Sequence, residues 1–287
     1  MMTIKDHLLV PAAGENITIN LTPHAGVNIK PTFLILHYTA TDSASSPINW
    51  FKDTKTNTDR IAAHIVLGKD GAITQLIPFN RKANHAGASN WDGHDGMNTM
   101  AIGIEIVNPG QVSKVFPAKN NKIIKVSHKN NPPGTGTNEF WFAYPPAQLA
   151  ALYQLCKAIL LAYPAIKTTL GHDDVSPFRK TDPGPAFSWD AFNLAVYGAT
   201  SPVGKIFTVN TAGTNFRKIP NTQGNDPIKK LSIGYQVGLI AVQGEWSKVF
   251  LANSSEDVIV KKSKPTKWYK QIGWIKSSLL TLKPSQI

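Results

Sequence analysis

The spacing of apolar residues changes near residue 200, and this change limits what the chain can fold into. Before Gly198, short apolar runs typical of strands alternate with segments whose apolar residues recur every three or four positions, as in helices. After Gly204, short strand-like pieces separated by turns predominate. The sequence therefore predicts two domains: an α/β domain over residues 1–200 and a small all-β barrel over residues 205–287.

The elements of the first domain can be placed along the chain. Strands are predicted within Thr32–Thr41, ending at His37, within Ala63–Phe79 as a pair joined by the turn KDG, and at Met100–Asn108; helices are predicted at Pro145–Tyr163 and Phe187–Gly198. The segment Val112–Asn138, rich in Lys, Asn, Gly and Pro, is predicted to be a long surface excursion.

Positive charge is concentrated in the C-terminal part. The 287 residues carry a formal charge of +12. Residues 201–287 hold 13 Lys and Arg against 4 Asp and Glu, a net of +9, whereas residues 1–200 hold 17 against 14, a net of +3. Such a surface favours an anionic polymer: nucleic acid, a membrane face or an acidic cell-wall glycan. All eight histidines lie in the first 172 residues, so candidate catalytic groups and charge are segregated along the chain.

Two further features narrow the class of protein. No window approaches the roughly 18 consecutive apolar residues of a membrane span, and the N-terminus lacks the basic start and apolar stretch of an ordinary signal peptide, so neither is expected. The single cysteine, Cys156, excludes an internal disulfide framework. It lies in a helix-like apolar run, so we expect a buried inert thiol rather than a nucleophile.

Two polar residues interrupt apolar strands, where burial without partners would be costly. His37 ends FLILH, and strand alternation puts it on the same face as Phe33 and Ile35. Glu105 lies inside IGIEIV on the same face as Gly103, whose missing side chain leaves room for another group to approach. Each could be structural, as a satisfied core histidine or a paired acid, or could belong to a site.

A third polar segment, GHDDVSPFRKTDPGP, begins at Gly171, and its glycines and prolines prevent a long helix. Catalytic zinc usually takes three protein ligands and leaves one position for water. Two histidines and one aspartate, His37, His172 and Asp182, meet that need. No compact metal motif such as HExxH is present, so the spacing alone indicates zinc only weakly.

The same segment supplies a cation. Lys180 lies two residues before Asp182, so in an extended segment both side chains point the same way, the carboxylate to the metal and the ammonium to whatever binds there. A free carboxylate is still required to take a proton from water, and Glu105 is the buried candidate.

Five stretches in this order, ILHYTAT, AAHIVLGKDGAITQLIPFN, NHAG, MNTMAIGIEIVN and GHDDVSPFRKTDPGP, resemble the zinc-dependent N-acetylmuramoyl-L-alanine amidases, the AmpD-like enzymes that share a fold with peptidoglycan recognition proteins. The resemblance covers roughly Pro31 to Pro185 and implies a central mixed β-sheet flanked by helices. It implies hydrolysis of the amide bond between N-acetylmuramic acid and L-alanine of peptidoglycan. The implied roles are a Zn²⁺ site for His37, His172 and Asp182, general acid/base catalysis for Glu105, and oxyanion stabilisation for Lys180.

Other residues in and beside the matched stretches are candidates for substrate contacts. These are Tyr38, Thr39, His64, Arg81, His85 and Asn98. Each has a structural alternative: strand-end packing for Tyr38 and Thr39, a core position for His64, a solvated face for Arg81, ring packing for His85 and a turn cap for Asn98. The histidines outside the matched motifs or in a glycine-rich loop are expected at the surface; they are His7, His24, His94 and His128. Asp173 and Asp174 flank a proposed ligand and could compete for the metal.

A second resemblance covers roughly Lys205 to Leu280. TNFRKIPN, GEWSKVF and IGWIKSSLL are similar to bacterial SH3-like domains, which implies an SH3-like barrel that holds an enzyme to peptidoglycan. The insert LANSSEDVIVKKSKPTKWYKQ is longer than the usual pattern. Four aromatic residues could form a binding face, although one or two of them are expected in the core. They are Trp246, Trp268, Tyr269 and Trp274.

The sequence thus predicts a zinc amidase that acts on peptidoglycan or a muropeptide. The alternative is a non-catalytic peptidoglycan-binding protein of the same fold, but such relatives usually lack a zinc ligand, and all three are present here. Nucleic-acid binding rests on charge alone and is not expected, and we expect a monomer. We expect the protein in the cell envelope (periplasm), or secreted by a route that does not use an N-terminal signal peptide, with the cytoplasm as the alternative.

Overall fold

The computed structural model of the 287-residue chain describes residues 2–113, 122–126, 128, 139–177, 179–198, 206–223, 225–252, 257–261 and 267–282. No helix among these residues is long and apolar enough to cross a membrane. The predicted boundary between residues 200 and 205 lies outside the described residues.

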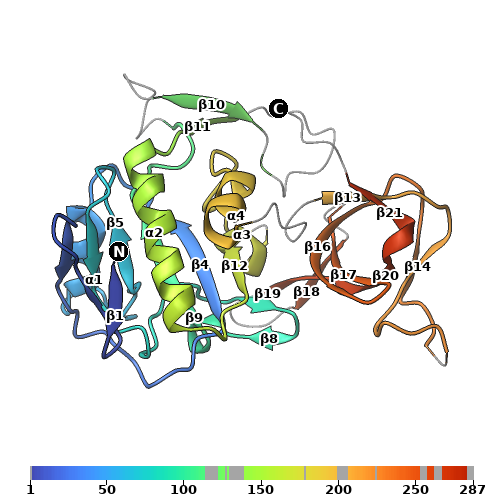
Figure 1. Cartoon of the computed structure of the whole chain (residues 1–287), viewed down its shortest axis with the longest axis horizontal. Helices are drawn as coiled ribbons and strands as arrows, with labels where there is room; N and C mark the ends of the chain where they lie inside the picture. The colour runs from blue at the N-terminus through green and yellow to red at the C-terminus, as the bar shows by residue number, and fades with distance from the viewer. Residues whose placement is uncertain are drawn as a thin grey trace.

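A six-stranded mixed sheet forms the centre of the first part of the chain (Figure 1). Its strands, in spatial order, are β12 (Thr168–Gly171), β4 (Phe33–Tyr38), β9 (Ala101–Ile106), β5 (Ile65–Leu67), β6 (Ile73–Gln75) and β3 (Ile17–Ile19). The strands β12, β4, β9 and β5 run parallel, and β5 pairs antiparallel with β6. This confirms the central mixed sheet that the resemblance implied.

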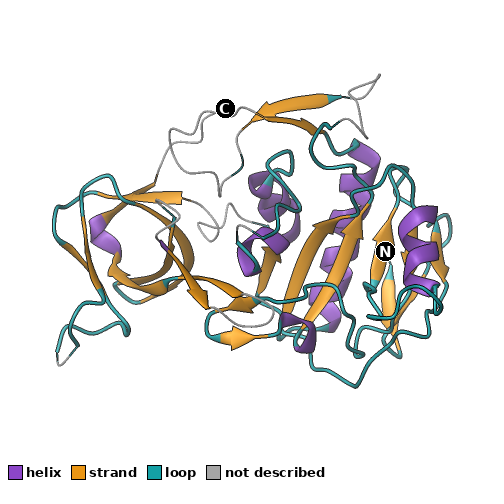
Figure 2. Cartoon of the chain, turned by 180° about the vertical axis from the view of Figure 1, so that it is seen from behind, coloured by secondary structure: helices purple, strands orange, loops and turns teal. Residues whose placement is uncertain are grey.

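Two helices cover one face of this sheet: α2 (Pro146–Ala162) and α4 (Trp189–Tyr197) (Figures 1 and 2). Helix α2 starts with a proline in its first turn, where no backbone N–H is needed. Helix α4 starts at the cap Ser188, whose hydroxyl accepts a hydrogen bond from the backbone N–H of Ala191, and ends at Gly198 in the left-handed conformation. Both predicted helices are therefore confirmed.

Strand alternation separates the two faces of the sheet. Leu34 and Leu36 of β4 pack with α2 and α4 in the main core, which also contains the fully buried Cys156. Burial raises the pKa of the Cys156 thiol, as expected for an inert position. Ile35 packs on the opposite face in a second cluster with Trp91. The face that carries Ile35 is the one predicted to carry His37.

The rest of the first part consists of short elements. These are β1 (Thr3–Lys5), β2 (Leu8–Val10), α1 (Ser45–Lys52), β7 (Asn90–Trp91), β8 (His94–Asp95), the 3-10 helix η1 (Met97–Thr99), β10 (Ile123–Val126), β11 (Glu139–Phe142) and the single-turn helix α3 (His172–Val175). The predicted surface excursion contains one element, β10, which pairs antiparallel with β11; most of its other residues lie outside the described ones. A non-helical path was predicted after Gly171, but the chain makes one helical turn there because the Asp174 carboxylate accepts the Gly171 backbone N–H at 2.9 Å.

The C-terminal part is all-β, as predicted. Its antiparallel sheet has the order β20 (Ile272–Lys276), β17 (Trp246–Leu251), β16 (Gln236–Gln243), β13 (Ile206–Val209) and β21 (Leu280–Leu282), the last strand following the 3-10 helix η3 (Ser277–Leu279). Two hairpins complete it: β14 (Thr214–Phe216) with β15 (Lys229–Leu231), and β18 (Val258–Lys261) with β19 (Lys267–Lys270). Phe216, Val237 and Val249 form the centre of a separate core.

The sequence insert between Leu251 and Gln271 contains the hairpin β18–β19. This hairpin extends from the C-terminal sheet towards the first part of the chain, where β19 lies against β7 and α3 (Figure 1). The insert that departs from the SH3-like pattern therefore contacts the larger part, together with residues of β17 such as Lys248 and Phe250.

Candidate metal centre and active site

The carboxyl ends of three neighbouring parallel strands, β12, β4 and β9, meet at one edge of the sheet. His37 is next to last in β4, and its register partner on β9 is Glu105. His172 follows directly after β12. Ligands of α/β proteins commonly bind at the carboxyl ends of parallel strands, so this topology brings the predicted polar residues to the expected edge.

Three side-chain atoms converge at this edge. Nδ1 of His37, Nδ1 of His172 and Oδ2 of Asp182 lie 2.9 Å from one another. The three residues are only 1%, 3% and 6% exposed. Protons cannot satisfy all three contacts, because an N–H aimed at the carboxylate oxygen is not aimed at the other imidazole. Two imidazoles and a carboxylate that converge in this way fit the ligand preferences of a divalent metal such as zinc.

The second nitrogen of each histidine determines which nitrogen is free to bind a metal. Nε2 of His172 lies 3.0 Å from the carbonyl oxygen of Ala86, which can only accept, and 3.3 Å from Nη2 of Arg179, which can only donate. We assign the proton to Nε2 on the shorter of these two contacts, which leaves Nδ1 with its lone pair. Nε2 of His37 lies 2.9 Å from Nδ1 of His85, whose own Nε2 faces the carbonyl oxygen of Ala101 at 3.4 Å. We therefore assign a donation from His37 to His85, which also leaves Nδ1 of His37 with a lone pair. Burial, and next the charge of His172, lower the pKa of His37 to about 4 and keep its ring neutral.

The position of His85 depends on a glycine in β9. A Cβ added to Gly103 would lie 2.5 Å from Cγ of His85, a distance that no side chain tolerates. Asn98 holds the backbone on either side of the ring, because its Oδ1 accepts from the N–H groups of His85 and Ala86 at 3.1 and 2.7 Å. The room predicted beside Glu105 is thus filled by the imidazole that supports His37.

Two carboxyl groups at this edge have pKa values shifted in opposite directions. Burial alone would raise the pKa of Asp182, but the adjacent imidazoles of His172 and His37 lower it below its usual range, so Asp182 is ionised. Burial, and next the carboxylate of Asp182, raise the pKa of Glu105 well above its usual value, while Lys180 lowers it. Oε2 of Glu105 is buried and makes no hydrogen bond among the described residues. A pair of carboxyl groups shifted apart in this way is typical of a site that divides binding and proton transfer between them.

The sequence analysis did not assign a role to Arg179. Its Nη2 donates to the carbonyl oxygens of Ala86 and Ala88 at 2.8 and 3.0 Å and to Oγ of Ser176 at 2.6 Å. Arg179 therefore ties the segment after α3 to the loop that carries His85. The sequence contained one clue to this role, because Arg179 lies between His172 and Asp182 in one glycine- and proline-rich segment. Its carbonyl partners are remote in sequence, so the sequence could not identify them.

Four of the predicted substrate-contact residues are already bonded within the protein. The hydroxyl of Tyr38 bonds that of Thr181 at 2.6 Å, and the hydroxyl of Thr39 joins the loop after β4 to the N–H of Asn108 at 3.3 Å. Nε of Arg81 donates to the carbonyl oxygen of Gly26 at 2.6 Å. The fourth, Asn98, holds the backbone beside His85 and has been described above.

His64 lies in the core rather than at the site. It is fully buried, its Nδ1 accepts the N–H of Gly103 at 3.0 Å, and its Nε2 donates to the carbonyl oxygen of Arg81 at 2.8 Å. Burial lowers the pKa of His64 to about 4. A substrate contact through this ring would require breaking one of these bonds, so the structure favours the core alternative.

The two aspartates beside His172 face other partners. Oδ2 of Asp173 lies 3.0 Å from Nε2 of His128, and Oδ1 of Asp174 lies 2.9 Å from Nζ of Lys270. Neither belongs to the group of converging ligand atoms. The surface position predicted for His128 is wrong, because Asp173 and Trp141 enclose it, and it is 4% exposed.

Of the other three histidines expected at the surface, one is buried and two are exposed. His24 is buried at 6% exposure, because its Nε2 bonds the carbonyl oxygen of Asp53 at 3.0 Å, so its predicted surface position is also wrong. His7 and His94 are exposed, as predicted.

Comparison with known proteins identifies the family of the first part of the chain. The family described as N-acetylmuramoyl-L-alanine amidase, Amidase_2, matches residues 28–185, more than half of the chain. The chain is 35% identical over 143 residues to the 1,6-anhydro-N-acetylmuramyl-L-alanine amidase AmpD of Escherichia coli K12, which covers 50% of this chain and 62% of that protein. It is 31% identical over 170 residues to the N-acetylmuramoyl-L-alanine amidase AmiD of the same organism, which covers 58% of this chain and 53% of that protein.

These matches therefore span between 53% and 62% of the length of the two relatives. Among solved structures, a crystal structure of an AmpD derivative superposes with a TM-score of 0.50 and 25% identity, covering 68% of this chain and 99% of that one. The fold, the matched residues and the converging histidines and aspartate lead to one conclusion: the chain belongs to the N-acetylmuramoyl-L-alanine amidase family.

Proposed function

We propose that this protein is a zinc-dependent N-acetylmuramoyl-L-alanine amidase, which hydrolyses the amide bond between N-acetylmuramic acid and L-alanine of peptidoglycan or of a muropeptide. The observation that carries the proposal is the convergence of ligand atoms from His37, His172 and Asp182 beside the buried carboxyl group of Glu105. All four residues lie within the segment that matches the family.

In this proposal each residue of the site has one task. His37, His172 and Asp182 hold the zinc ion, which when bound polarises the scissile carbonyl group and makes water a better nucleophile near neutral pH. Glu105 takes the proton of the attacking water and passes it to the departing amine of L-alanine. Its raised pKa suits this task, because a group that gives and takes protons near neutral pH works best when its pKa is close to the operating pH.

Lys180 is assigned to the developing negative charge on the carbonyl oxygen. In support of this role, the positive charge of Lys180 lowers the pKa of both Glu105 and His37. Loss of such a contact typically costs about a hundredfold or more in rate.

We further propose that residues 205–287 are an SH3-like domain that holds the enzyme to an anionic cell wall. The net charge of +9 over residues 201–287 and the half-buried indole of Trp274 support this role. Trp246 is 8% exposed and serves the fold instead, and the side chains of Trp268 and Tyr269 lie outside the described residues. A wall-binding domain favours the polymer as substrate and a place in the cell envelope or outside the cell.

Digestion of purified peptidoglycan with and without a chelator tests the activity. Mass analysis should find intact stem peptides that begin with a free L-alanine amine, and the chelator should abolish them until zinc is restored. Products cut within the glycan or within the stem peptide, with the muramoyl–alanine bond intact, would contradict the assignment.

A further inference from the structure

The hairpin β18–β19 places a buried cation against the helix that carries His172. Nζ of Lys270 lies 2.9 Å from Oδ1 of Asp174, and the two side chains are 5% and 12% exposed. The same ammonium lies 3.9 Å from the centre of the Phe250 ring and 6.0 Å from that of Trp91. This ion pair is therefore held between the two parts of the chain and shielded from solvent, where charges interact most strongly.

Asp174 links this cation to the start of α3. Its Oδ1 faces Lys270, while its Oδ2 accepts the backbone N–H of Gly171, the residue before His172. Asp173, the residue after His172, donates its backbone N–H to the carbonyl oxygen of Asp182 at 2.9 Å. The single turn of α3 thus fixes one proposed ligand directly and is bonded to the backbone of another, so a shift of α3 would disturb both.

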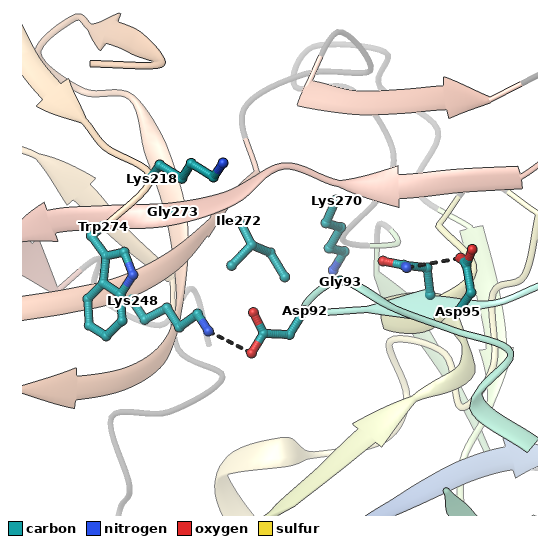
Figure 3. A pocket seen from close by; sticks show the side chains of 10 residues that line it. Asp92, Gly93, Asp95, Lys218, Lys248, Lys270, Ile272, Gly273 and Trp274 are labelled. Carbon is teal, nitrogen blue, oxygen red and sulfur yellow. Dashed lines mark hydrogen bonds and ion pairs between the residues drawn. The ribbon is translucent and has the colours of Figure 1, made fainter. Parts of the chain in front are cut away.

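A second ion pair crosses the same junction without touching α3. Nζ of Lys248 lies 2.6 Å from Oδ2 of Asp92, in the turn between β7 and β8, and the side chains are 23% and 34% exposed (Figure 3). Both Lys248 and Lys270 line a cavity of about 500 Å³ between the two parts of the chain. The Lys248–Asp92 pair therefore provides a matched control, because it joins the same two parts at a distance from the ligands.

We propose that Lys270 is a positioning residue for the metal centre: through Asp174 it holds α3 so that His172 and Asp182 keep their places around the metal. This inference rests on the proposed zinc site. It makes the C-terminal part a component of the catalytic centre as well as a wall-binding domain.

The test compares full-length variants by their affinity for zinc, measured by competition with a chelator, and by the absorption spectrum of the cobalt(II) form. Loss of a direct outer partner of a metal ligand typically costs about 10- to 100-fold in affinity. Because Lys270 acts on the ligands only through Asp174 and α3, Lys270→Met should weaken zinc binding by about tenfold, the lower end of that range, and should alter the cobalt spectrum. Lys248→Met should leave both within about twofold of the wild type. Lys270→Arg, which keeps the charge, should restore much of the affinity.

Asp174→Asn removes the charge of the other partner in the same ion pair. It serves as the second variant if Lys270→Met does not fold. It should also weaken zinc binding, and the double variant Lys270→Met/Asp174→Asn should bind zinc better than the sum of the two losses predicts. A lower melting temperature with unchanged zinc affinity and cobalt spectrum in Lys270→Met and Asp174→Asn would overturn the inference and leave Lys270 as a simple domain contact. If the wild type itself binds no zinc, the proposed function fails, and this inference fails with it.

Discussion

The edge of the sheet at β4, β9 and β12 and the junction between the two parts of the chain both bury charged side chains, but they pair them differently. At the junction, Lys270 faces Asp174 and Lys248 faces Asp92, so each cation has a carboxylate within 3 Å. At the sheet edge, three ligand atoms face one another at equal distances that protons cannot satisfy, and the buried Oε2 of Glu105 has no hydrogen bond among the described residues.

The difference separates structure from chemistry. A buried charge that is paired with an opposite charge mainly fixes the relative positions of the elements that carry the two side chains. Buried polar atoms that converge without mutual satisfaction cost stability, and proteins keep such arrangements mainly where a ligand or a reaction uses them. Burial and charge alone would not have distinguished the two regions.

The largest contrast should come from two neighbouring aspartates. Asp182→Ala removes a proposed ligand, so it should abolish tight zinc binding and lower hydrolysis by about a thousandfold or more, since a metal supplies several kcal/mol of transition-state stabilisation. Asp173→Asn changes a carboxylate that faces His128 and should keep zinc at one ion per chain. Elemental analysis and the rate of L-alanine-terminated product release would measure both. Zinc lost from Asp173→Asn but kept in Asp182→Ala would reverse the ligand assignment.

A smaller effect should follow from Glu105→Gln. The variant should bind zinc as the wild type does, because Glu105 is not a proposed ligand, but its rate should fall by about 10²- to 10⁴-fold, the usual contribution of a general acid/base. Retention of the full rate with zinc bound would remove Glu105 from the mechanism and leave the metal site intact.

The same substitution should change how stability depends on pH in the metal-free protein. The pKa of Glu105 is raised in the fold above its ordinary value of 4.5, so the native state binds its proton more tightly than the unfolded state does. Its contribution to stability is therefore complete below about pH 4.5 and is lost as pH rises through the raised value. The melting temperature of Glu105→Gln should exceed that of the wild type increasingly as pH rises, whereas Glu245→Gln, at a 70% exposed side chain, should show no such trend.

The smallest effect concerns His64. It lies in the first part of the chain, as the candidate metal centre does, but its polar atoms are paired like those at the junction, because both ring nitrogens make hydrogen bonds. Its lowered pKa of about 4 means that stability is full above about pH 6.5 and is lost as pH falls through 4. His64→Gln should cost about 1 kcal/mol near neutral pH and should flatten the stability profile between about pH 6.5 and 4. Denaturant unfolding would measure this, with the exposed His94→Gln as the control; an unchanged slope would contradict the lowered pKa of His64 and its assignment to the core.

The sequence indicated the sheet and half of the site because the relevant signals are local. His37 and Glu105 stood out as polar residues inside apolar strands. Period-two alternation placed His37 on the face of Ile35, which in the structure is the face opposite α2. The selection of Asp182 over Asp173 and Asp174 came from the family resemblance. Spacing could not decide it, because the three carboxylates differ only in what surrounds them after folding.

The remaining features depend on contacts between segments far apart in the chain. Arg179 reaches carbonyl groups more than 90 residues away, and Asp174 meets a lysine 96 residues away. His128 was expected at the surface because it lies outside the matched motifs; Trp141 and Asp173 enclose it only in the fold. Periodicity and local composition contain no information about such partners.

The hairpin β18–β19 has a practical consequence for anyone who would replace the C-terminal part with another domain. A fusion cut near residue 200 would discard Lys270 and expose Trp91, Asp92 and Asp174, which face the junction. A replacement domain would need to supply a cation over α3, or the recipient would need an uncharged residue at position 174. An exchange of the C-terminal part therefore has to transfer or rebuild the contact surface on the first part of the chain as well.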